Sequence, residues 1–293
     1  MSFEAIFEGQ RARLTRLAYR MLASIAEAED AVQDAWLRWS RSDPDKIDDP
    51  AAWLVRVTTR LCVDRLRRER SRRETYVGPW LPEPLVEEPA DDPVERAEEV
   101  SVAFLLALQR LSPLERAVFL LRDVFDQDYA GIAEALGRTQ TACRQLAGRA
   151  RAHLRQARPR FDVSQAEAER LVAAFRDAAE RNDTAGLARL LAEDCVLITD
   201  GGGKRAAALR PFVGREDIMQ FLRGFGWRHG WPPPGAVRPA RINGFPGLVW
   251  EDADGVQTLA FEPGEGGTIA AIYVVRNPDK LGRVARRHGL AAD

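Results

Sequence analysis

Apolar residues recur at helical spacing through the first 73 positions of the chain. Apolar stripes run along residues 3–22, 26–39 and 51–73, and a polar loop at 40–50 that contains two prolines separates the last two. Apolar groups at i, i+3, i+4 and i+7 are typical of helices that bury one face, and proline disfavours helix in the residue before it. The pattern therefore predicts a bundle of helices over residues 1–75.

The helix at 26–39 has a second, polar face around one leucine. Asp30, Gln33, Asp34 and Leu37 fall at i, i+3, i+4 and i+7. Hydrogen-bonding groups around one apolar anchor suit docking onto a basic protein surface. A solvated acidic face is the plainer alternative.

The helix at 51–73 ends in a run of basic residues. Six arginines lie between Arg65 and Arg73. Cations at a helix C-terminus compensate the helix dipole, but six exceed that need and indicate contacts with phosphates. Trp53 on the same helix could pack in the core or stack on an unpaired base.

Residues 76–97 differ sharply in composition from the helices before them. Five prolines interrupt this stretch, and residues 76–99 hold eight acidic side chains against one basic side chain. Proline and charge favour an extended, solvated linker. The apolar segment Trp80-Leu81-Pro82 is unusual in such a linker, and we expect it to dock onto another part of the chain.

Helical patterns return over residues 98–160, where residues 100–160 carry ten basic and five acidic side chains. Asp128 can cap a helix at 129–136, Gly137 suits a left-handed turn, and Thr139 or Thr141 can cap the next helix. That helix has a small apolar side and a long basic side, as a helix in the DNA major groove requires. The solvated face of an ordinary helical bundle remains the alternative.

From residue 163 the pattern mixes helices and strands. Helices are expected at 164–181, 184–192 and 218–225. Strands are expected at 195–199 and at about 237–243, 247–252, 256–262 and 268–275. Helices followed by a curved antiparallel sheet predict an α+β domain over 163–285, with a tail at 286–293.

Composition narrows the classes of function. No apolar run reaches the length of a membrane span, and the N-terminus lacks the layout of a secretory signal, so we expect a cytoplasmic protein. The overall net charge of −1 hides the acidic linker beside the basic segment. Cys62 and Cys143 lie among apolar residues of the expected helices, which predicts buried free thiols there. The three cysteines form no CxxC pair and the three histidines do not cluster, so we expect no metal site and no cofactor.

Three stretches, taken in order, resemble a sigma factor of the extracytoplasmic-function class. They are AEAEDAVQDAWLRW at 26–39, PAAWLVRVTTRLCVDRLRRERSR at 50–72, and the segment from SPLERAVFLLRDVF at 112 to RAHLR at 155. The resemblance implies region 2 of such a factor at 1–75 and region 4 at 98–160. It also implies core RNA polymerase (the β′ and β subunits) and promoter DNA as partners.

The resemblance assigns roles to individual residues. The polar face of Asp30, Gln33, Asp34 and Leu37 would dock on the β′ coiled coil of the polymerase. The next set would hold the −10 promoter element: Trp53, Arg56, Arg60, Arg67 and Arg68. The last set would read the −35 element from the major groove: Thr139, Gln140, Thr141, Arg144, Gln145 and Arg149.

The C-terminal domain resembles the SnoaL-like, nuclear-transport-factor-like cone fold, which a subgroup of these sigma factors carries. Three signatures match that subgroup: WLPEP at 80–84, DGGGK at 200–204 and NPDKL at 277–281. The resemblance implies regulation in cis without a dedicated anti-sigma factor. We expect mutual contact among these residues: Trp80, Leu81, Pro82, Asp200, Gly201, Gly202, Gly203, Lys204, Asn277, Pro278, Asp279, Lys280 and Leu281.

Two alternatives concern the C-terminal domain. Relatives of the cone fold include enzymes that use an acid as general base, for which Asp200 and Asp194 are the candidates; a docking role is the stronger interpretation, so we predict no enzyme. A small-molecule ligand could occupy this domain. The whole chain could then be a one-component helix-turn-helix regulator, although such a regulator explains neither the polar face at 30–37 nor the arginine-rich helix.

Overall fold

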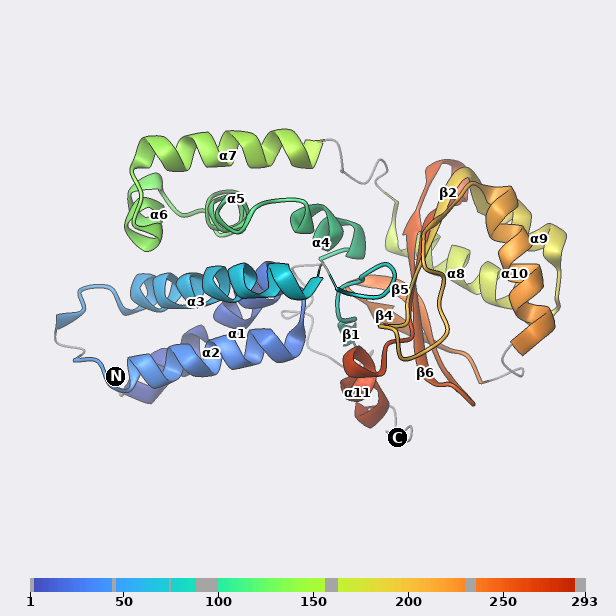
Figure 1. Ribbon diagram of the computed structural model, residues 1–293, viewed down its shortest axis with the longest axis horizontal. Coiled ribbons are helices and arrows are strands. Elements are labelled where there is room, and N and C mark those ends of the chain that lie inside the picture. The colour runs from blue at the N-terminus through green and yellow to red at the C-terminus, as the bar shows by residue number, and fades with distance from the viewer. Residues whose placement is uncertain are drawn as a thin grey trace. The chain divides into compact units, whose positions relative to one another are not determined.

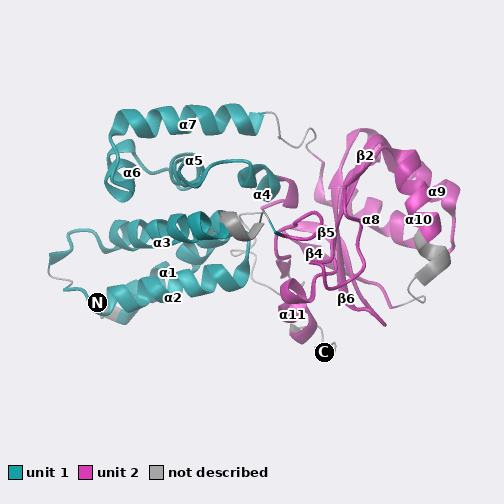
Figure 2. Cartoon of the chain, in the orientation of Figure 1, with its two compact units in different colours: residues 1–75, 104–158 teal, residues 76–103, 159–293 magenta. Residues whose placement is uncertain are grey.

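The computed structural model describes residues 3–43, 46–73, 75–87, 100–155, 163–229 and 236–287. The chain forms two compact units, coloured in Figure 2. The helical unit comprises residues 1–75 and 104–158, and the C-terminal unit comprises residues 76–103 and 159–293. The segment that begins at Tyr76 thus belongs to the C-terminal unit, although two parts of the helical unit flank it in the sequence.

The first part of the helical unit is a three-helix bundle (Figure 1). Its helices are α1 (Phe3–Leu22), α2 (Ile25–Trp39) and α3 (Pro50–Arg73). Ser24 caps α2 by accepting a hydrogen bond from the Glu27 N–H. Trp39 is fully buried and packs against Trp53, with ring centroids 5.5 Å apart. The predicted helices and their buried sides are confirmed.

The second part of the helical unit contains the expected helix-turn-helix. Its elements are α4 (Val102–Gln109), α5 (Pro113–Phe119), the π-helical turn η3 (Leu120–Val124), α6 (Tyr129–Leu136) and α7 (Gln140–Arg155). Asp128 caps α6, and Gly137 ends it with a φ of 62°, where a side chain would be strained. Thr139 accepts from the Ala142 N–H and so caps α7. The π turn at 120–124 was not predicted.

The C-terminal unit combines helices with a seven-stranded sheet in the order β1-β4-β5-β6-β7-β2-β3. The helices that pack on the sheet from one side are α8 (Gln165–Glu180), α9 (Thr184–Leu190) and α10 (Arg215–His229) (Figure 1). The strands are β1 (Val86–Glu87), β2 (Leu191–Asp200), β3 (Phe212–Val213), β4 (Arg238–Ile242), β5 (Phe245–Asp252), β6 (Gly255–Pro263) and β7 (Ile269–Val275).

The expectation of a wholly antiparallel sheet is wrong. Strand β7 pairs with β2 in parallel, from Leu191 opposite Ile269 to Asp200 opposite Val275, whereas the other pairings are antiparallel. A parallel pair needs a long crossover, and the many residues between these two strands supply it. The pairing brings the ends of β2 and β7 together, and these ends carry two of the three signatures.

Several elements of the C-terminal unit were missed from the sequence, among them the 3-10 turn η4 (Glu265–Gly267). Strands β1 and β3 have two residues each, too few for a periodic pattern. Helix α11 (Pro278–Arg287) begins inside the NPDKL signature at 277–281, where the sequence pattern predicts no helix. Asn277 accepts from the Asp279 N–H at 3.0 Å, so its side chain starts α11 as a cap.

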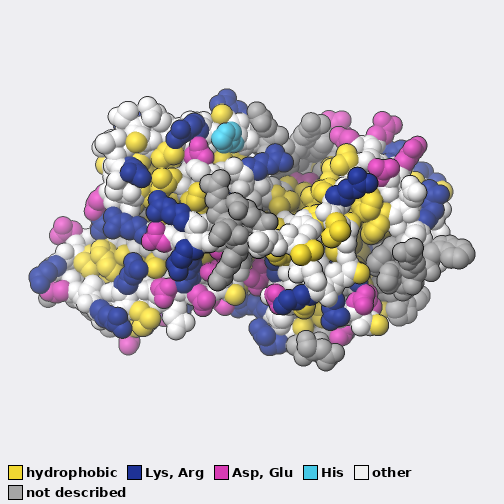
Figure 3. Space-filling model, viewed as in Figure 1, with side chains coloured by type: hydrophobic (Ala, Val, Ile, Leu, Met, Phe, Trp, Pro, Cys, Tyr) yellow, Lys and Arg dark blue, Asp and Glu magenta, His cyan; other side chains and the backbone are white. Residues whose placement is uncertain are grey.

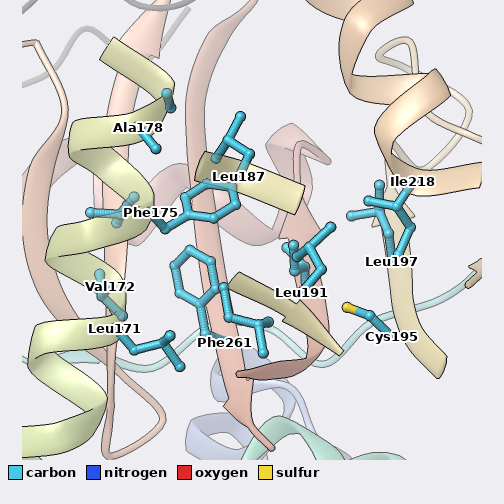
Figure 4. Packing of buried hydrophobic residues seen from close by; sticks show 14 of the residues in the cluster. Leu171, Val172, Phe175, Ala178, Leu187, Leu191, Cys195, Leu197, Ile218 and Phe261 are labelled. Carbon is cyan, nitrogen blue, oxygen red and sulfur yellow. The ribbon is translucent and has the colours of Figure 1, made fainter. Parts of the chain in front are cut away.

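Side chains fill the space between the sheet and α8, α9 and α10 (Figure 4). Phe175 of α8 meets Phe261 of β6 edge-on, with ring centroids 4.9 Å apart. Leu197 of β2 and Ile218 of α10 close the cluster at its other end. The inside of the cone is therefore a packed core.

No helix in the described part of the chain is long and apolar enough to cross a membrane. Among the same residues, no group of histidine, cysteine and acidic side chains could hold a metal ion. Cys62 and Cys143 are buried free thiols, as predicted, and so is Cys195. Burial raises the pKa of Cys62 and of Cys195 to about 12.

Candidate functional site

The predicted polymerase-docking face lies at the surface of α2. Asp30 and Gln33 are exposed, and Leu37 keeps 43% of its surface in solvent. Asp34 accepts a hydrogen bond of 2.7 Å from Nη2 of Arg65 on α3. The face is thus a polar surface with one apolar side chain, and an ion pair fixes one of its acids.

The residues predicted for the −10 element share helix α3 but differ in their surroundings. Trp53 is half-buried against Trp39, which supports a packing role for part of its ring. Arg67 and Arg68 are exposed, and Arg67 lies 3.2 Å from Asp64. Figure 3 shows Lys and Arg side chains, in dark blue, spread over the visible face of the helical unit.

Two of these arginines bind the first helix of the helix-turn-helix. Arg60 donates from Nε to the Ala135 carbonyl at 2.6 Å and from Nη2 to the Glu134 carbonyl at 2.9 Å. Arg56 forms an ion pair with the Glu134 carboxylate. The carbonyls at the end of a helix carry partial negative charge, so the Arg60 guanidinium compensates the C-terminus of α6. No pattern in the sequence predicts this contact.

All six residues predicted for the −35 element are exposed on α7 or at its start. Thr139 is the capping residue, and Arg144 donates to Gln140 one turn earlier at 3.2 Å. Arg149 lies 3.3 Å from Glu115 of α5. These side chains form one polar surface that an incoming duplex could reach, and their role in DNA reading stays a prediction.

The three signatures of the C-terminal unit meet at Asp200, the last residue of β2. Its carboxylate is fully buried and accepts from the Tyr76 hydroxyl at 2.6 Å, the Leu81 N–H at 2.8 Å and Nζ of Lys280 at 2.7 Å. The Gly202 N–H donates to the same carboxylate at 3.0 Å. Four donors on one carboxylate satisfy a charge that would otherwise be costly to bury. We call this cluster the latch: Tyr76, Trp80, Leu81, Asp200, Asn277 and Lys280.

Lys280 is the second charge of the latch. Its Nζ also donates to the Leu81 carbonyl at 2.6 Å, and it lies 4.3 Å from the centre of the Trp80 ring and 5.1 Å from that of Tyr76. An ammonium group over aromatic faces gains cation–π attraction. Burial, followed by the hydrogen bond to Asp200, raises the pKa of Tyr76, so its hydroxyl stays a proton donor.

The glycines of the DGGGK turn let the signatures approach closely. Gly202 has a φ of 62°, and a side chain there would overlap the Asn277 amide, which donates to the Tyr76 hydroxyl at 2.8 Å. Lys204 forms an ion pair of 2.7 Å with Asp279. The other predicted members join the same assembly: Pro82, Gly201 and Leu281 are buried, Gly203 faces Val77, and Pro278 begins α11.

Sequence reasoning missed several residues that hold the latch in place. Tyr76 stands just before the signature in the linker, and its aromatic ring in an acidic, proline-rich stretch was the available signal. Asn243 binds both backbone groups of Leu85, accepting from its N–H and donating its own N–H to its carbonyl. Arg276 binds the Ala206 carbonyl and, at 2.6 Å, Asp254.

The two acids considered as catalytic bases have unlike surroundings. Asp194 is exposed on β2, whereas four donors occupy the carboxylate of Asp200. A general base must reach a substrate proton within hydrogen-bond distance. The surroundings of Asp200 therefore support a structural role for this acid.

Comparison with known proteins identifies the class of the helical unit. Residues 6–72 match the family model for sigma-70 region 2, and residues 101–154 match the one for sigma-70 region 4. A chain with both regions in this order is a sigma factor. The one-component regulator is not favoured, because it has no use for region 2.

The particular kind of sigma factor follows from full-length relatives. The chain is 38% identical to the ECF RNA polymerase sigma factor SigJ of Mycobacterium tuberculosis, over 94% of this chain and 92% of the relative. It is 36% identical to the probable ECF sigma factor SigI of the same organism, over 94% of each chain. The crystal structure of M. tuberculosis SigJ superimposes with a TM-score of 0.78 at 34% identity, covering 94% of this chain and 97% of that one.

The chain therefore belongs to the ECF RNA polymerase sigma factors, and its function is promoter recognition with RNA polymerase. The predicted fold class is confirmed as well, with two helical sigma regions followed by an α+β domain.

Proposed function

We propose that this sigma factor is regulated in cis by its C-terminal unit through the latch. One observation carries the proposal: the segment between regions 2 and 4 is hydrogen-bonded, through Tyr76 and Leu81, to the buried ion pair of Asp200 and Lys280 in the C-terminal unit. The path between the two DNA-binding regions then depends on whether the latch is closed. A ligand or a partner that favours the open form would shift the population toward it.

The surfaces of the helical unit supply the rest of the proposed function. The face of Asp30, Gln33, Asp34 and Leu37 docks on the β′ subunit, α3 holds the −10 element, and α7 reads the −35 element. The polar groups around Leu37 suit docking on a protein, and the arginines of α3 suit contact with phosphates. The exposed side chains at the N-terminal end of α7 suit a helix that enters the major groove. We further propose that the protein acts in the cytoplasm without enzymatic activity and without a dedicated anti-sigma factor.

The contact between α3 and α6 adds a condition for promoter binding. In this contact α6 occupies Nε and Nη2 of Arg60 and Nη1 of Arg56, which leaves these guanidiniums with fewer donors and less charge for promoter phosphates. We therefore expect this contact to open when the −10 element binds.

The central experiment is run-off transcription with purified core polymerase and a Trp80→Ala variant. Loss of the ring over Lys280 weakens the latch, so we expect altered output from a folded protein. Val213→Ala is the matched control, because Val213 is an exposed apolar residue of the same unit, outside the latch. Equal output from Trp80→Ala and the wild type would contradict regulation through the latch.

Truncations separate activation from inhibition. A chain ending after Arg160 lacks most of the C-terminal unit, and a chain ending after Lys280 lacks most of α11 but keeps the latch residues. Opposite changes in output would show that the domain both supports and restrains the sigma regions. Wild-type output from both chains would argue against regulation in cis.

A further inference from the structure

A groove runs along α8 on the side that faces β4 and β5. Its volume is about 430 Å³, and a smaller pocket continues it toward Trp250 at the other end of the helix. Ligand sites in proteins typically have volumes of about 300–1,000 Å³. The groove borders the packed core in which Phe175 and Phe261 meet, and it shares Val172 and Leu248 with that core.

Small side chains leave this space open. Ala173 of α8, Ala240 of β4 and Gly247 of β5 line the groove, where larger residues would fill it. Gly247 is itself required by the packing, because a side chain there would press against the Leu259 carbonyl and Ile242. The floor is apolar, with Val172 and Leu248 between these positions.

Two guanidinium groups give the groove its charge. Arg176 of α8 and Arg241 of β4 line it, and the acid among the described lining residues is Glu169, which accepts a hydrogen bond of 2.8 Å from Gln165. Arg176 also lies 3.4 Å from Asp177, the next residue of α8. Arg241 donates from Nη2 to the Gly244 carbonyl at 2.6 Å, which fixes the position of its planar group. Arginine presents up to five donors in a fork that matches a carboxylate.

We propose that this groove binds a small amphipathic organic anion, with an apolar body on the floor and a carboxylate at Arg176 and Arg241. Desolvation of the apolar body supplies affinity, and the guanidiniums select the negative head group. A cation of the same shape would be repelled by the two guanidiniums. A neutral analogue would bind more weakly than the anion, because it offers the guanidiniums no carboxylate.

The segment that begins at Tyr76 is held at a second place, where its strand β1 pairs with β4, and the groove lies next to this pairing. Arg241 is the ladder partner of Glu87 in β1, and Ile242 is that of Val86. An anion held by Arg241 thus contacts β4, the strand that pairs with β1. This link to transcription rests on the proposed regulation in cis, whereas the binding site itself does not.

The test uses the full chain and three probes of equal length: decanoate, decan-1-ol and decylamine, each below its aggregation limit. Calorimetry should show saturable binding of decanoate, about tenfold or more tighter than that of the other two. Arg176→Gln and Arg241→Gln should each weaken decanoate by about tenfold, the effect of losing one charge-assisted hydrogen bond. Arg189→Gln, at an exposed arginine of α9 outside the groove, should bind as the wild type does.

Ala173→Leu is a second test of the groove, which holds even if the arginine variants fail to fold. Ala173 is exposed, so a leucine there is tolerated while it narrows the groove, and decanoate should bind more weakly. No saturable decanoate binding at millimolar concentration would overturn the site. Equal affinity for decylamine, or binding unchanged in both arginine variants, would do the same.

Transcription assays separate the site from its regulatory link. Decanoate should change run-off output of the wild type and leave that of Arg176→Gln unchanged. Binding without a change in output would overturn the link to transcription and leave the site in place. An effect of Trp80→Ala without decanoate binding would overturn the site and leave regulation through the latch standing.

Discussion

Removal of the Asp200 charge tests the latch most directly, because its carboxylate is fully buried and pairs with Lys280. In Asp200→Asn the ammonium group keeps the Leu81 carbonyl and the ring of Trp80 but loses its counter-charge. Leaving one charge of a buried pair uncompensated costs about 3–5 kcal/mol. Because Lys280 keeps these other partners, we expect a loss near the lower limit, about 3 kcal/mol.

The reverse change should cost less. Lys280→Met keeps the length of the side chain, and Asp200 retains the donors Tyr76, Leu81 and Gly202. We expect a loss of about 1.5–3 kcal/mol, the worth of one hydrogen bond to a charged group whose other partners stay in place. The double variant should lose less than the sum of the single variants, since the second change removes a charge that the first left unpaired.

Urea unfolding of the C-terminal unit, followed by tryptophan fluorescence, gives these free energies, and hydrogen exchange at the Leu81 amide reports the latch locally. Exchange at Leu81 should speed up in Asp200→Asn by the factor that corresponds to its loss of stability. A cost below about 1 kcal/mol for Asp200→Asn would refute the reasoning, because a well-solvated pair costs no more than that. Strict additivity in the double variant would also refute it.

Three further predictions concern other parts of the chain. Burial raises the pKa of Glu262 from 4.5 to about 7, so the folded state resists loss of this proton as pH rises through that range. Glu262→Gln should therefore raise stability by about 3 kcal/mol at pH 8 and hardly at pH 4, and a pH-independent change in Tm would contradict this. Gly202→Ala should cost about 2 kcal/mol or more, since the new residue has a strained φ and its side chain overlaps Asn277. Gly224→Ala has open space around it in α10 and should stabilise the protein by about 0.5–1 kcal/mol. Equal denaturation midpoints for the two variants would contradict this difference. Glu134→Gln removes the carboxylate charge that pairs with Arg56, so the holoenzyme should open the −10 element up to about fivefold faster. Permanganate footprinting measures this opening, and an unchanged rate would contradict a role for the contact.

The sequence predicted the helical unit better than the sheet. Caps such as Asp128 and Gly137 act within a few residues, so a local pattern locates α6. The parallel pairing of β2 with β7 and the two-residue strands β1 and β3 depend on distant partners, which leave no periodic trace in their own residues. The contact of Arg60 with Ala135 also depends on a distant partner. An arginine that binds a helix end cannot be distinguished in the sequence from one that binds phosphate.

The latch shows how far a resemblance can extend such reasoning. The apolar Trp80 in an acidic linker indicated docking, and the three signatures indicated the partners. Only the structure shows that one carboxylate joins them and that Tyr76 and Asn277 complete the cluster. Backbone donors such as the Leu81 N–H exist at nearly every position, so their use cannot be read from side-chain identity.

The C-terminal unit is discontinuous in sequence, and this affects the order of events during synthesis. Tyr76 binds Asn277, 201 positions later, and the Leu81 carbonyl binds Lys280, 199 positions later. At synthesis rates of about 5–20 residues per second, the linker would wait about 10–40 s for these partners. During that interval both sigma regions leave the ribosome with no latch to join them, and the latch can close only when α11 is being made. A chain that is terminated early, within the last strands, would thus be a sigma factor whose two DNA-binding regions are complete and unlatched.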